Sequence, residues 1–465
     1  MQKKLGLVIT DGVGFRNFIL SNFLNEAKST FDEVVIYSCL DKEVYKGFTT
    51  NEKIVELEVF KENFFTWFFM KLKEVAHLQL NKKKSFGILD SYNINKTFSK
   101  TNRGIAKRVI YFITKFLKSE FWIQRFNYFQ KITFRNHRIT KDYIKYLKKD
   151  DVDFLFFTHQ RPPYIAPLIY ATEQLNIKNA TFIFSWDNLA SKGRMAGNFN
   201  HYFVWSDLMK TELLEFYANV KTNQVHVVGT PQFEPYVYDE YGYEKETFYN
   251  KFNLDKNLKA IFFTCNDSSS ENDPIYLKSL VEFIKHNKLV EDVNLIVRTS
   301  PAENPERFES LAKEYNFIKW NYPDWKTKRH NHQESWSQRV PSLEDLNDLK
   351  MLLKHCDICI NVLSTITLDA FVFNKPVINP VFGNQSNNLY DDQKFLEYEH
   401  LKNLVNSQAS IIAKNETEYL EAINYLLEGK DDKSLKRAKF LDLQIGNTLQ
   451  GTCQGIVNTI NKCIN

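Results

Sequence analysis

Residues 358–381 constrain the fold of this chain more than any other segment. An apolar run leads into a cluster of hydroxyl side chains, and a helical stretch and a second apolar run follow. The hydroxyls belong to Ser364, Thr365 and Thr367. Strand, loop, helix start and strand in this order are typical of a parallel α/β unit. Hydroxyls and free backbone N–H groups at such a helix start form an anion site suited to a phosphate. The alternative interpretation is that the hydroxyls only cap a buried helix.

The same alternation of apolar strands and helices runs along the whole chain. Strands are expected at residues 3–10, 32–39, 151–160, 180–188, 201–206, 225–236, 258–266 and 293–301. A chain of 465 residues exceeds what one hydrophobic core usually holds. We therefore predict an α/β protein with two Rossmann-like domains that face each other across a cleft, one at residues 1–232 and one at residues 233–465. Ligands would bind at the carboxyl ends of the strands.

Charge is distributed unevenly along the sequence. Residues 61–150 contain 21 Lys/Arg against 6 Asp/Glu, although the net charge of the whole chain is only +5. The same stretch contains 19 aromatic residues. We predict a helical, basic and aromatic insertion in the N-terminal domain. Within it, one side of an expected helix at residues 105–130 carries Ile105, Val109, Phe112 and Phe116.

Two interpretations of this insertion remain open. Aromatic and aliphatic side chains beside lysines suit a helix that lies in a membrane interface, where anionic lipid attracts the cations. Alternatively, the helices bury their aromatic side chains in the N-terminal domain and expose their lysines to solvent. Nucleic acid is not an expected partner, because no recognition motif accompanies the charge.

The sequence also bears on where the protein works. No apolar run reaches the ~18–20 residues that a membrane-spanning helix needs, and the first residues resemble a strand rather than a signal peptide. We therefore expect a cytoplasmic protein, which the membrane-interface interpretation of the insertion would attach peripherally to the inner membrane.

Two motifs resemble those of a known enzyme group. Residues 364–370, STITLDA, resemble the donor-nucleotide loop of GT-B glycosyltransferases, where serines or threonines lead into a helix with an acidic residue and then alanine. Residues 227–233, VVGTPQF, resemble the strand-Gly-x-Pro turn that opens the second domain in GT-B enzymes of bacterial surface-polysaccharide synthesis. NDP-sugar 2-epimerases share this fold and are included in the resemblance.

The resemblance implies a donor site in the C-terminal domain. The phosphates of a nucleotide sugar would be held by Ser364, Thr365, Thr367 and Arg298, and Asp369 would hold the ribose. Arg298 follows the strand residues NLIV, and a guanidinium fork matches phosphate geometry and offsets the charge of a departing nucleoside diphosphate. A surface or salt-bridging arginine is the alternative.

Polar residues also follow the strands of the N-terminal half. An inverting sugar transfer needs a base that takes the proton of the acceptor hydroxyl, and Asp11, His159 and Asp187 are the candidates. Each has another explanation, since Asp11 could cap the first helix, His159 could satisfy a buried carbonyl, and Asp187 could hold a turn. A retaining mechanism would need no such base. The residues expected near the acceptor or the sugar are Gly12, Gly14, Arg16, Trp186 and Asn188.

These observations favour a metal-independent glycosyltransferase that moves a sugar from a nucleotide-sugar donor to a polysaccharide or lipid-linked acceptor at the cytoplasmic membrane face. The expected partners are the donor, the acceptor and an anionic membrane surface. No cofactor and no essential metal are expected, because no DxD pair follows a strand and the His residues of HNH (330–332) lack a third ligand. The alternatives are an NDP-sugar 2-epimerase, a CDP-polyol phosphotransferase, and a non-catalytic scaffold in a membrane-associated assembly.

Overall fold

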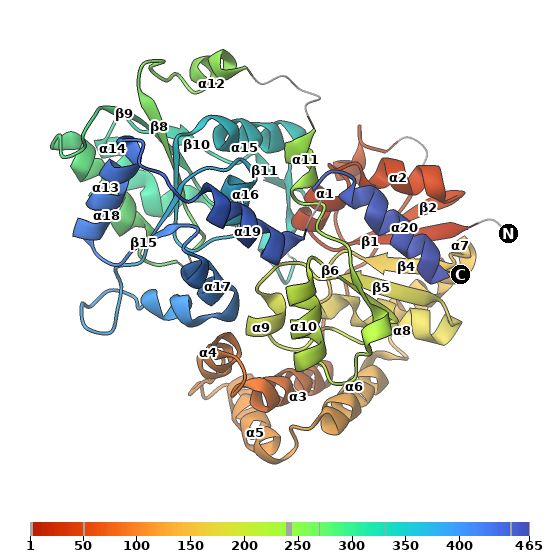
Figure 1. The fold of residues 1–465 in the computed structure, drawn as a ribbon. Helices are drawn as coiled ribbons and strands as arrows, with labels where there is room; N and C mark the ends of the chain where they lie inside the picture. Colours follow the sequence, from red (N-terminus) through yellow and green to blue (C-terminus); the bar gives the residue numbers. More distant parts are fainter. Residues whose placement is uncertain are drawn as a thin grey trace. The chain divides into compact units, whose positions relative to one another are not determined.

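The computed structural model describes residues 3–49, 52–238, 244–268, 270–330, 332–446 and 449–464. The chain forms two compact units (Figure 1). Unit 1 contains Met1–Pro235, Thr327–Val340 and Gln444–Asn465, and unit 2 contains Tyr236–Lys326 and Pro341–Leu443. The first crossing therefore lies close to the predicted boundary after residue 232. Two later segments, 327–340 and 444–465, belong to unit 1, whereas the prediction placed them in the second domain.

Unit 1 is built on a parallel sheet of seven strands in the order β3-β2-β1-β4-β5-β6-β7. The strands are β1 (Lys4–Ile9), β2 (Glu33–Ser38), β3 (Lys53–Glu56), β4 (Phe154–Phe157), β5 (Lys178–Phe182), β6 (His201–Val204) and β7 (Val225–Val227). The near-continuous apolar sequences of β1 and β4 suit a sheet that is covered on both faces, and all four residues of β4 are buried. β1 pairs with both β2 and β4, so the strand order reverses there. Loops after strands at such a switch point face a common crevice.

Helices cover this sheet, and one of them returns from the far end of the sequence. They are α1 (Gly12–Phe18), α2 (Phe23–Thr30), α7 (Arg138–Asp150), α8 (Ala166–Leu175), α9 (Asn188–Ser191), α10 (Asp207–Phe216) and α20 (Thr452–Ile464). In Figure 1, α20 (blue) lies along α2 (red). The carboxylate of Glu234, on α11 (Glu234–Val237), accepts hydrogen bonds from the backbone N–H groups of Gly451 and Cys453 and so anchors the start of α20.

The predicted helical insertion of unit 1 is confirmed. It contains α3 (Phe64–Asn81), α4 (Phe86–Ile94), α5 (Asn102–Phe116) and α6 (Glu120–Phe134), and α7 follows. α3 packs against α4, α5 and α6 (Figure 1). Asn63, Ser85 and Thr101 cap three of these helices by accepting a hydrogen bond from a backbone N–H in the first turn.

Unit 2 is built on a second parallel sheet, of six strands in the order β10-β9-β8-β13-β14-β15. The strands are β8 (Lys259–Thr264), β9 (Val293–Arg298), β10 (Lys319–Asn321), β13 (Ile358–Asn361), β14 (Val377–Pro380) and β15 (Ile411–Ala413). Its helices are α12 (Lys245–Lys251), α13 (Asp273–Lys285), α14 (Glu309–Glu314), α15 (Leu343–His355), α16 (Ile366–Val372), α17 (Glu399–Ser407), α18 (Glu416–Leu427) and α19 (Ser434–Ile445). Two short strands, β11 (Trp325–Thr327) and β12 (Arg339–Pro341), pair at the ends of the segment that enters unit 1.

Two Rossmann-like units of this kind confirm the predicted fold class. Among the helices that the structure describes, none combines the length and the hydrophobicity that are needed to cross a bilayer.

Candidate functional sites

The first candidate site lies where β1 and β4 end in unit 1. α1 begins directly after β1, and Asp11 caps it, because its Oδ1 accepts a hydrogen bond from the backbone N–H of Gly14 at 2.8 Å. The other oxygen, Oδ2, lies 2.9 Å from Nδ1 of His159 and accepts the hydroxyl hydrogen of Thr10 at 2.7 Å. His159 follows β4, the neighbour of β1 in the sheet. The sheet therefore brings together two residues that are 148 positions apart in the sequence.

The surroundings fix the charge of this pair. Burial raises the pKa of Asp11, but the hydrogen bonds from His159, Thr10 and Gly14 outweigh it, so the pKa lies below its usual value and the carboxylate is ionised. Burial lowers the pKa of His159, and Asp11 opposes this only in part, so the imidazole is neutral at pH 7. A carboxylate at Nδ1 keeps the proton of the neutral ring there, which leaves Nε2 as a proton acceptor. The ring of His159 also stacks on Phe184, with 3.9 Å between the ring centroids.

Residues 327–340 contribute to the same region of unit 1. Glu334 is half-buried, and its pKa is raised by burial and by the charge of Asp11, although Arg161 opposes the rise. Trp336 approaches Phe184 with 6.5 Å between the ring centroids. Sequence reasoning missed this contribution, because the polar stretch at 318–348 carries no hydrophobic period that would place it against the first sheet.

The two glycines after β1 are explained by packing within unit 1. A Cβ on Gly12 would clash with the carbonyl oxygen of Arg339, in the segment that enters from the second half of the chain. A Cβ on Gly14 would lie 2.7 Å from Oγ1 of Thr158. The predicted contact of these glycines with a sugar stays a prediction. Arg16 lies in the last turn of α1 and is half-buried.

The loop after β5 contains the third candidate base. Oδ1 of Asp187 accepts a hydrogen bond from the side-chain amide of Asn188, and its Oδ2 lies 3.4 Å from Nζ of Lys192. These contacts match the turn-holding alternative for Asp187. Trp186 is buried, and Oδ1 of Asn188 accepts a hydrogen bond from the side-chain amide of Gln160. In the structure, Asp11 therefore contacts His159, whereas Asp187 contacts Asn188 and Lys192 of its own turn.

The end of this loop attaches the helical insertion to the sheet. Gly193 packs so closely on Glu74 of α3 that a Cβ there would clash with the glutamate side chain. The guanidinium of Arg194 binds the carboxylate of Glu120 on α6, with contacts of 2.5 and 3.1 Å. It also lies over the ring of Tyr217, 4.4 Å from the ring centroid. The residues Gly193 and Arg194 therefore have a structural role.

The second candidate site is the hydroxyl loop of unit 2. It follows β13 and leads into α16, as the sequence predicts. Ser364 and Thr365 are partly exposed, and the backbone N–H of Ser364 donates to Oδ1 of Asn361 at 2.9 Å. Leu363 has a φ of 51°, in the left-handed region that bulky side chains rarely adopt. Strain of this kind often accompanies a binding or catalytic loop.

The deeper residues of this loop have protein partners. The hydroxyl of Thr367 donates to Oδ1 of Asn361 at 3.0 Å, and Thr367 is fully buried. Oδ1 of Asp369 accepts the phenolic hydrogen of Tyr236 at 2.7 Å, and Asp369 is also buried. Each side chain would have to exchange a partner or move to bind a ligand. The predicted phosphate role of Thr367 and ribose role of Asp369 therefore stay predictions.

Arg298 lies at the end of β9, as expected, but it is buried in an ion pair. Its Nη2 donates to both carboxylate oxygens of Asp345, at 2.9 and 2.8 Å, and its Nη1 donates to Asn321. Asp345 also accepts hydrogen bonds from the backbone N–H of Asp324 and from the indole N–H of Trp325. This arrangement matches the salt-bridging alternative for Arg298, and the phosphate role stays a prediction.

A third polar cluster in unit 2 was not predicted. The hydroxyl of Tyr276 hydrogen-bonds to Asp392 and accepts the backbone N–H groups of Phe382 and Gly383, at 2.9 and 3.2 Å. The side-chain amide of Asn272 donates to Oδ2 of Asp392 at 2.9 Å. The cluster thereby fixes the loop that starts at Gly383 beside the start of α13. The sequence does not show that these residues are in contact, because the contact depends on how α13 packs against the loop that contains Asp392.

Within the described parts of the chain, one group of His and Cys residues lies close enough to share a metal ion. Nδ1 of His201 lies 3.1 Å from Nε2 of His226, and Sγ of Cys463 lies 3.6 Å from the same nitrogen. A hydrogen bond between the two neutral rings accounts for the shorter contact, since burial is the main cause that lowers the pKa of both histidines. The predicted independence of metals and cofactors stays a prediction.

Comparison with known proteins bears on the fold. No protein family model matches the sequence, and no curated protein matches it. Solved structures do match along the whole chain. The UDP complex of MnaA from S. aureus has a TM-score of 0.57 and 12% sequence identity, and the match covers 100% of this chain and 97% of that one.

Two further structures agree. The UDP-GlcNAc 2-epimerase from Methanocaldococcus jannaschii has a TM-score of 0.53 and 13% identity, with 99% of each chain covered. A glycosyltransferase from Rickettsia africae has a TM-score of 0.52 and 14% identity, again with 99% of each chain covered. The chain therefore has the fold of two Rossmann-like units that NDP-sugar 2-epimerases and GT-B glycosyltransferases share, as its sequence resemblance predicted.

Proposed function

We propose that this protein is a glycosyltransferase that uses a nucleotide-sugar donor, with His159 as the base that activates the acceptor. The observation that carries the proposal is the buried contact between Asp11 and His159 at the switch point of the first sheet. In the reaction, the acceptor oxygen bonds to the anomeric carbon of the sugar while its proton passes to Nε2 of His159. The bond from that carbon to the nucleoside diphosphate breaks, and the diphosphate departs with the electron pair.

Asp11 would act as a positioning residue in this step. Its carboxylate fixes the ring of His159 and stabilises the imidazolium that forms when the proton arrives. The neutral state of His159 at pH 7 suits a base that must be unprotonated before each turnover. Phe184 restricts the ring to one plane, so that Nε2 keeps a constant direction.

The donor would bind at the hydroxyl loop of unit 2. Ser364 and Thr365 are the partly exposed hydroxyls of the predicted set, and they stand at the end of β13 where ligands of open α/β sheets bind. Similar structures contain UDP or UDP-GlcNAc, which supports a nucleotide-sugar ligand for this fold. The buried Thr367, Asp369 and Arg298 would then shape the loop from below.

An NDP-sugar 2-epimerase is the second candidate function. Several of the similar structures are UDP-GlcNAc 2-epimerases, and the match to them is as complete as the match to the glycosyltransferase. An epimerase would act on a nucleotide sugar without an acceptor. A large exposed apolar surface on α5 and its neighbours gives such an enzyme no advantage, and it favours the transferase with a glycan or lipid-linked acceptor. A CDP-polyol phosphotransferase would need a base for its acceptor hydroxyl as well, so a preference for CDP or CMP would distinguish it. A non-catalytic scaffold would need no base.

Thermal unfolding in the presence of UDP, GDP, CDP, CMP, dTDP and their common sugar conjugates tests the donor site. A ligand at 100-fold its Kd stabilises the native state by about 2.7 kcal/mol, which is easily measured. We expect one base to stabilise the wild type and to lose at least tenfold in affinity with Ser364→Ala/Thr365→Val. Ser407→Ala, which removes a hydroxyl from α17, is the matched control. Equal stabilisation of all three proteins would contradict the assigned loop, and no stabilisation by any nucleotide would favour the scaffold.

A further inference from the structure

The apolar side of α5 faces away from the protein. Its buried face includes Ala106, Ile110 and Tyr111 and packs on α3. The ring of Tyr111 also packs on Tyr92 of α4, with 5.0 Å between the ring centroids. The opposite face is an exposed apolar stripe, with exposed fractions of 47% for Ile105, 45% for Val109, 63% for Phe112 and 72% for Phe116. Helix α5 therefore buries one apolar face and leaves a second one, the stripe from Ile105 to Phe116, exposed.

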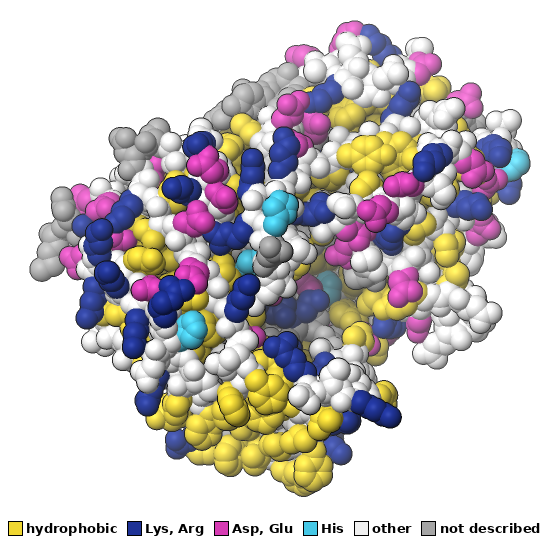
Figure 2. Space-filling model, turned by 180° about the vertical axis from the view of Figure 1, so that it is seen from behind, with side chains coloured by type: hydrophobic (Ala, Val, Ile, Leu, Met, Phe, Trp, Pro, Cys, Tyr) yellow, Lys and Arg dark blue, Asp and Glu magenta, His cyan; other side chains and the backbone are white. Residues whose placement is uncertain are grey.

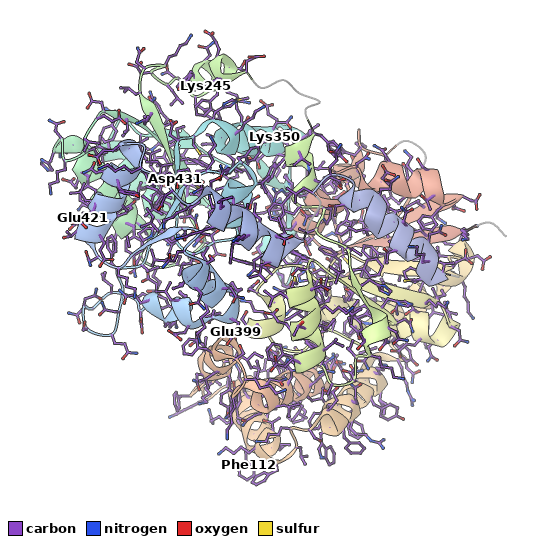
Figure 3. The ribbon with its side chains drawn as sticks, in the orientation of Figure 1. Phe112, Lys245, Lys350, Glu399, Glu421 and Asp431 are labelled. Carbon is purple, nitrogen blue, oxygen red and sulfur yellow. The ribbon has the colours of Figure 1, made fainter. Side chains whose placement is uncertain are left out.

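Neighbouring elements extend this stripe into a continuous surface. Phe98, in the loop before α5, is 93% exposed, and Phe65, Phe121 and Tyr128 are each more than half exposed. Figure 2 shows apolar side chains gathered at the lower end of the molecule, with Lys and Arg around them. Figure 3 shows Phe112 at the outer edge of the same helices. We call the exposed side chains of α3, α5, α6 and the loop before α5 the aromatic surface. Exposed apolar side chains that gather in one patch mark an interaction site.

A basic pocket opens beside the aromatic surface, between α4 and α5. It has a volume of about 320 Å³, and its cations are Lys96, Lys107, Arg108 and Lys115. Phe98 and Phe112 belong both to the pocket and to the aromatic surface. Among the described residues that line it, none is an Asp or a Glu. Residues 82–118 as a whole contain ten Lys/Arg and a single acidic residue, Asp90.

The cations around this pocket repel one another. The pKa of Lys82 is lowered by burial and then by four other lysines, among them Lys96 and Lys115. The pKa of Lys107 is lowered by burial and by Lys71, against an opposing effect of Glu74. Nζ of Lys96 lies over the ring of Tyr92, 4.7 Å from the ring centroid, which is a weak substitute for a counter-ion. An anion in the pocket would remove this repulsion.

We propose that the aromatic surface docks onto an anionic lipid membrane and that the basic pocket takes the phosphate group of a lipid headgroup. Apolar rings would enter the boundary between headgroups and acyl chains, and lysine side chains would extend along them to the phosphates. The proposal is independent of the nucleotide-sugar chemistry, because docking needs no donor. A second copy of the chain is a poor occupant, since residues 61–150 carry 21 Lys/Arg against 6 Asp/Glu and two such faces would repel.

Co-sedimentation of the full chain with vesicles tests the proposal. Vesicles of phosphatidylcholine alone are compared with vesicles that contain about 30% phosphatidylglycerol, whose anionic headgroups attract basic segments. We expect binding to the anionic vesicles, at least tenfold weaker binding to the neutral ones, and a loss of the preference in high salt. Equal binding to both compositions would overturn the headgroup assignment, and no binding to either would overturn the docking surface.

Two pairs of variants separate the surface from the pocket. Phe112→Ser/Phe116→Ser should weaken binding to anionic vesicles at least tenfold, whereas Phe317→Ser/Leu435→Ser, which removes exposed apolar side chains of unit 2, should leave it unchanged. Arg108→Gln/Lys115→Gln should abolish most of the preference for phosphatidylglycerol. The control Lys313→Gln/Lys326→Gln removes two exposed lysines of unit 2 and should leave the preference for phosphatidylglycerol unchanged. If a pair of variants and its control changed vesicle binding equally, the residues assigned to the aromatic surface or to the pocket would be wrong.

Two further measurements exclude other occupants. Light scattering without lipid should give one mass at all concentrations, and a dimer that Phe112→Ser/Phe116→Ser dissociates would show that the surface joins two copies instead. Inorganic phosphate should stabilise the protein no more than chloride of equal ionic strength, because a headgroup pocket gains its affinity from the adjoining membrane. Saturable stabilisation by inorganic phosphate that is lost in Arg108→Gln/Lys115→Gln, with unchanged vesicle binding, would identify a free phosphate as the ligand.

Discussion

Oδ2 of Asp11 lies 2.9 Å from Nδ1 of His159, and both side chains are buried where the first sheet reverses its strand order. An ionised carboxylate and a neutral imidazole in this contact form a base of defined orientation. The contact is possible because the two residues follow β1 and β4, which are neighbouring parallel strands.

The first prediction concerns the charge of Asp11. Asp11→Asn keeps the size of the side chain and its ability to cap α1, but it removes the carboxylate that fixes the proton on Nδ1 of His159. Turnover should fall by about 100- to 10,000-fold, the usual contribution of a general base, while KM for the donor changes little. Release of nucleoside diphosphate measures this. Asp187→Asn is the control, since its carboxylate serves a turn, and a similar loss there would undermine the assignment.

The second prediction concerns pH. Burial lowers the pKa of His159 below its usual value of 6.5, so the folded state binds fewer protons there than the unfolded state in weak acid. Its contribution to stability is therefore complete above pH 6.5 and is lost as the pH falls below that value. Urea unfolding of wild type and His159→Gln at pH 7.5 and pH 5 measures this. The wild type should lose more stability on acidification than the variant, and equal losses would contradict a neutral buried ring.

The third prediction concerns the ion pair of Arg298 with Asp345. Asp345→Ala leaves a buried guanidinium without its carboxylate, which should cost about 3–5 kcal/mol of unfolding free energy. Arg298→Met/Asp345→Leu should recover part of this loss, because a pair of apolar side chains needs no counter-charge, although the N–H groups of Asp324 and Trp325 lose their acceptor. Denaturant unfolding gives both values.

The same double variant tests the role of Arg298 in donor binding. If the arginine is structural, the refolded double variant should bind the donor nucleotide within a few-fold of wild type. A well-folded double variant that has lost nucleotide binding would show that Arg298 contacts the phosphates, as the sequence resemblance implies.

The fourth prediction concerns the segment that enters unit 1. Gly12→Ala places a Cβ against the backbone carbonyl of Arg339, which cannot yield as a side-chain tip can. The variant should lose about 1–3 kcal/mol of stability, the usual cost of overpacking. Gly455→Ala on α20 is the matched control, because a Cβ there meets open space and alanine favours a helix. Thermal and denaturant unfolding compare the two, and equal effects would contradict the close approach of residue 339.

The sequence was sufficient for the inner strands of the two sheets, because apolar strands such as Phe154–Phe157 alternate with helices along the chain. The short edge strands β3, β10 and β15 were not predicted. The helical stretch after β1 is divided into α1 (Gly12–Phe18), which Asp11 caps, and α2 (Phe23–Thr30). The turn at VVGTPQF was recognisable because Gly229 has a φ of +75°, which favours glycine.

Contacts between distant segments were not predictable from local pattern. Arg298 ends a strand in both roles that were considered for it, and only its partner Asp345 shows which role the structure favours. Likewise, the stripe from Ile105 to Phe116 has the same period whether it faces the core or solvent. The pairing of Asp11 with His159 follows from the strand order, which the sequence alone does not specify.

The most direct test of the proposed function uses the nucleotide sugar that stabilises the protein. It is incubated with the wild type in D₂O, with and without a bacterial lipid extract, and followed by NMR. We predict release of the nucleoside diphosphate that depends on the extract, is lost in His159→Gln, and occurs without deuterium at C2 of the sugar. Deuterium at C2 in the absence of the extract would contradict the transferase and identify a 2-epimerase.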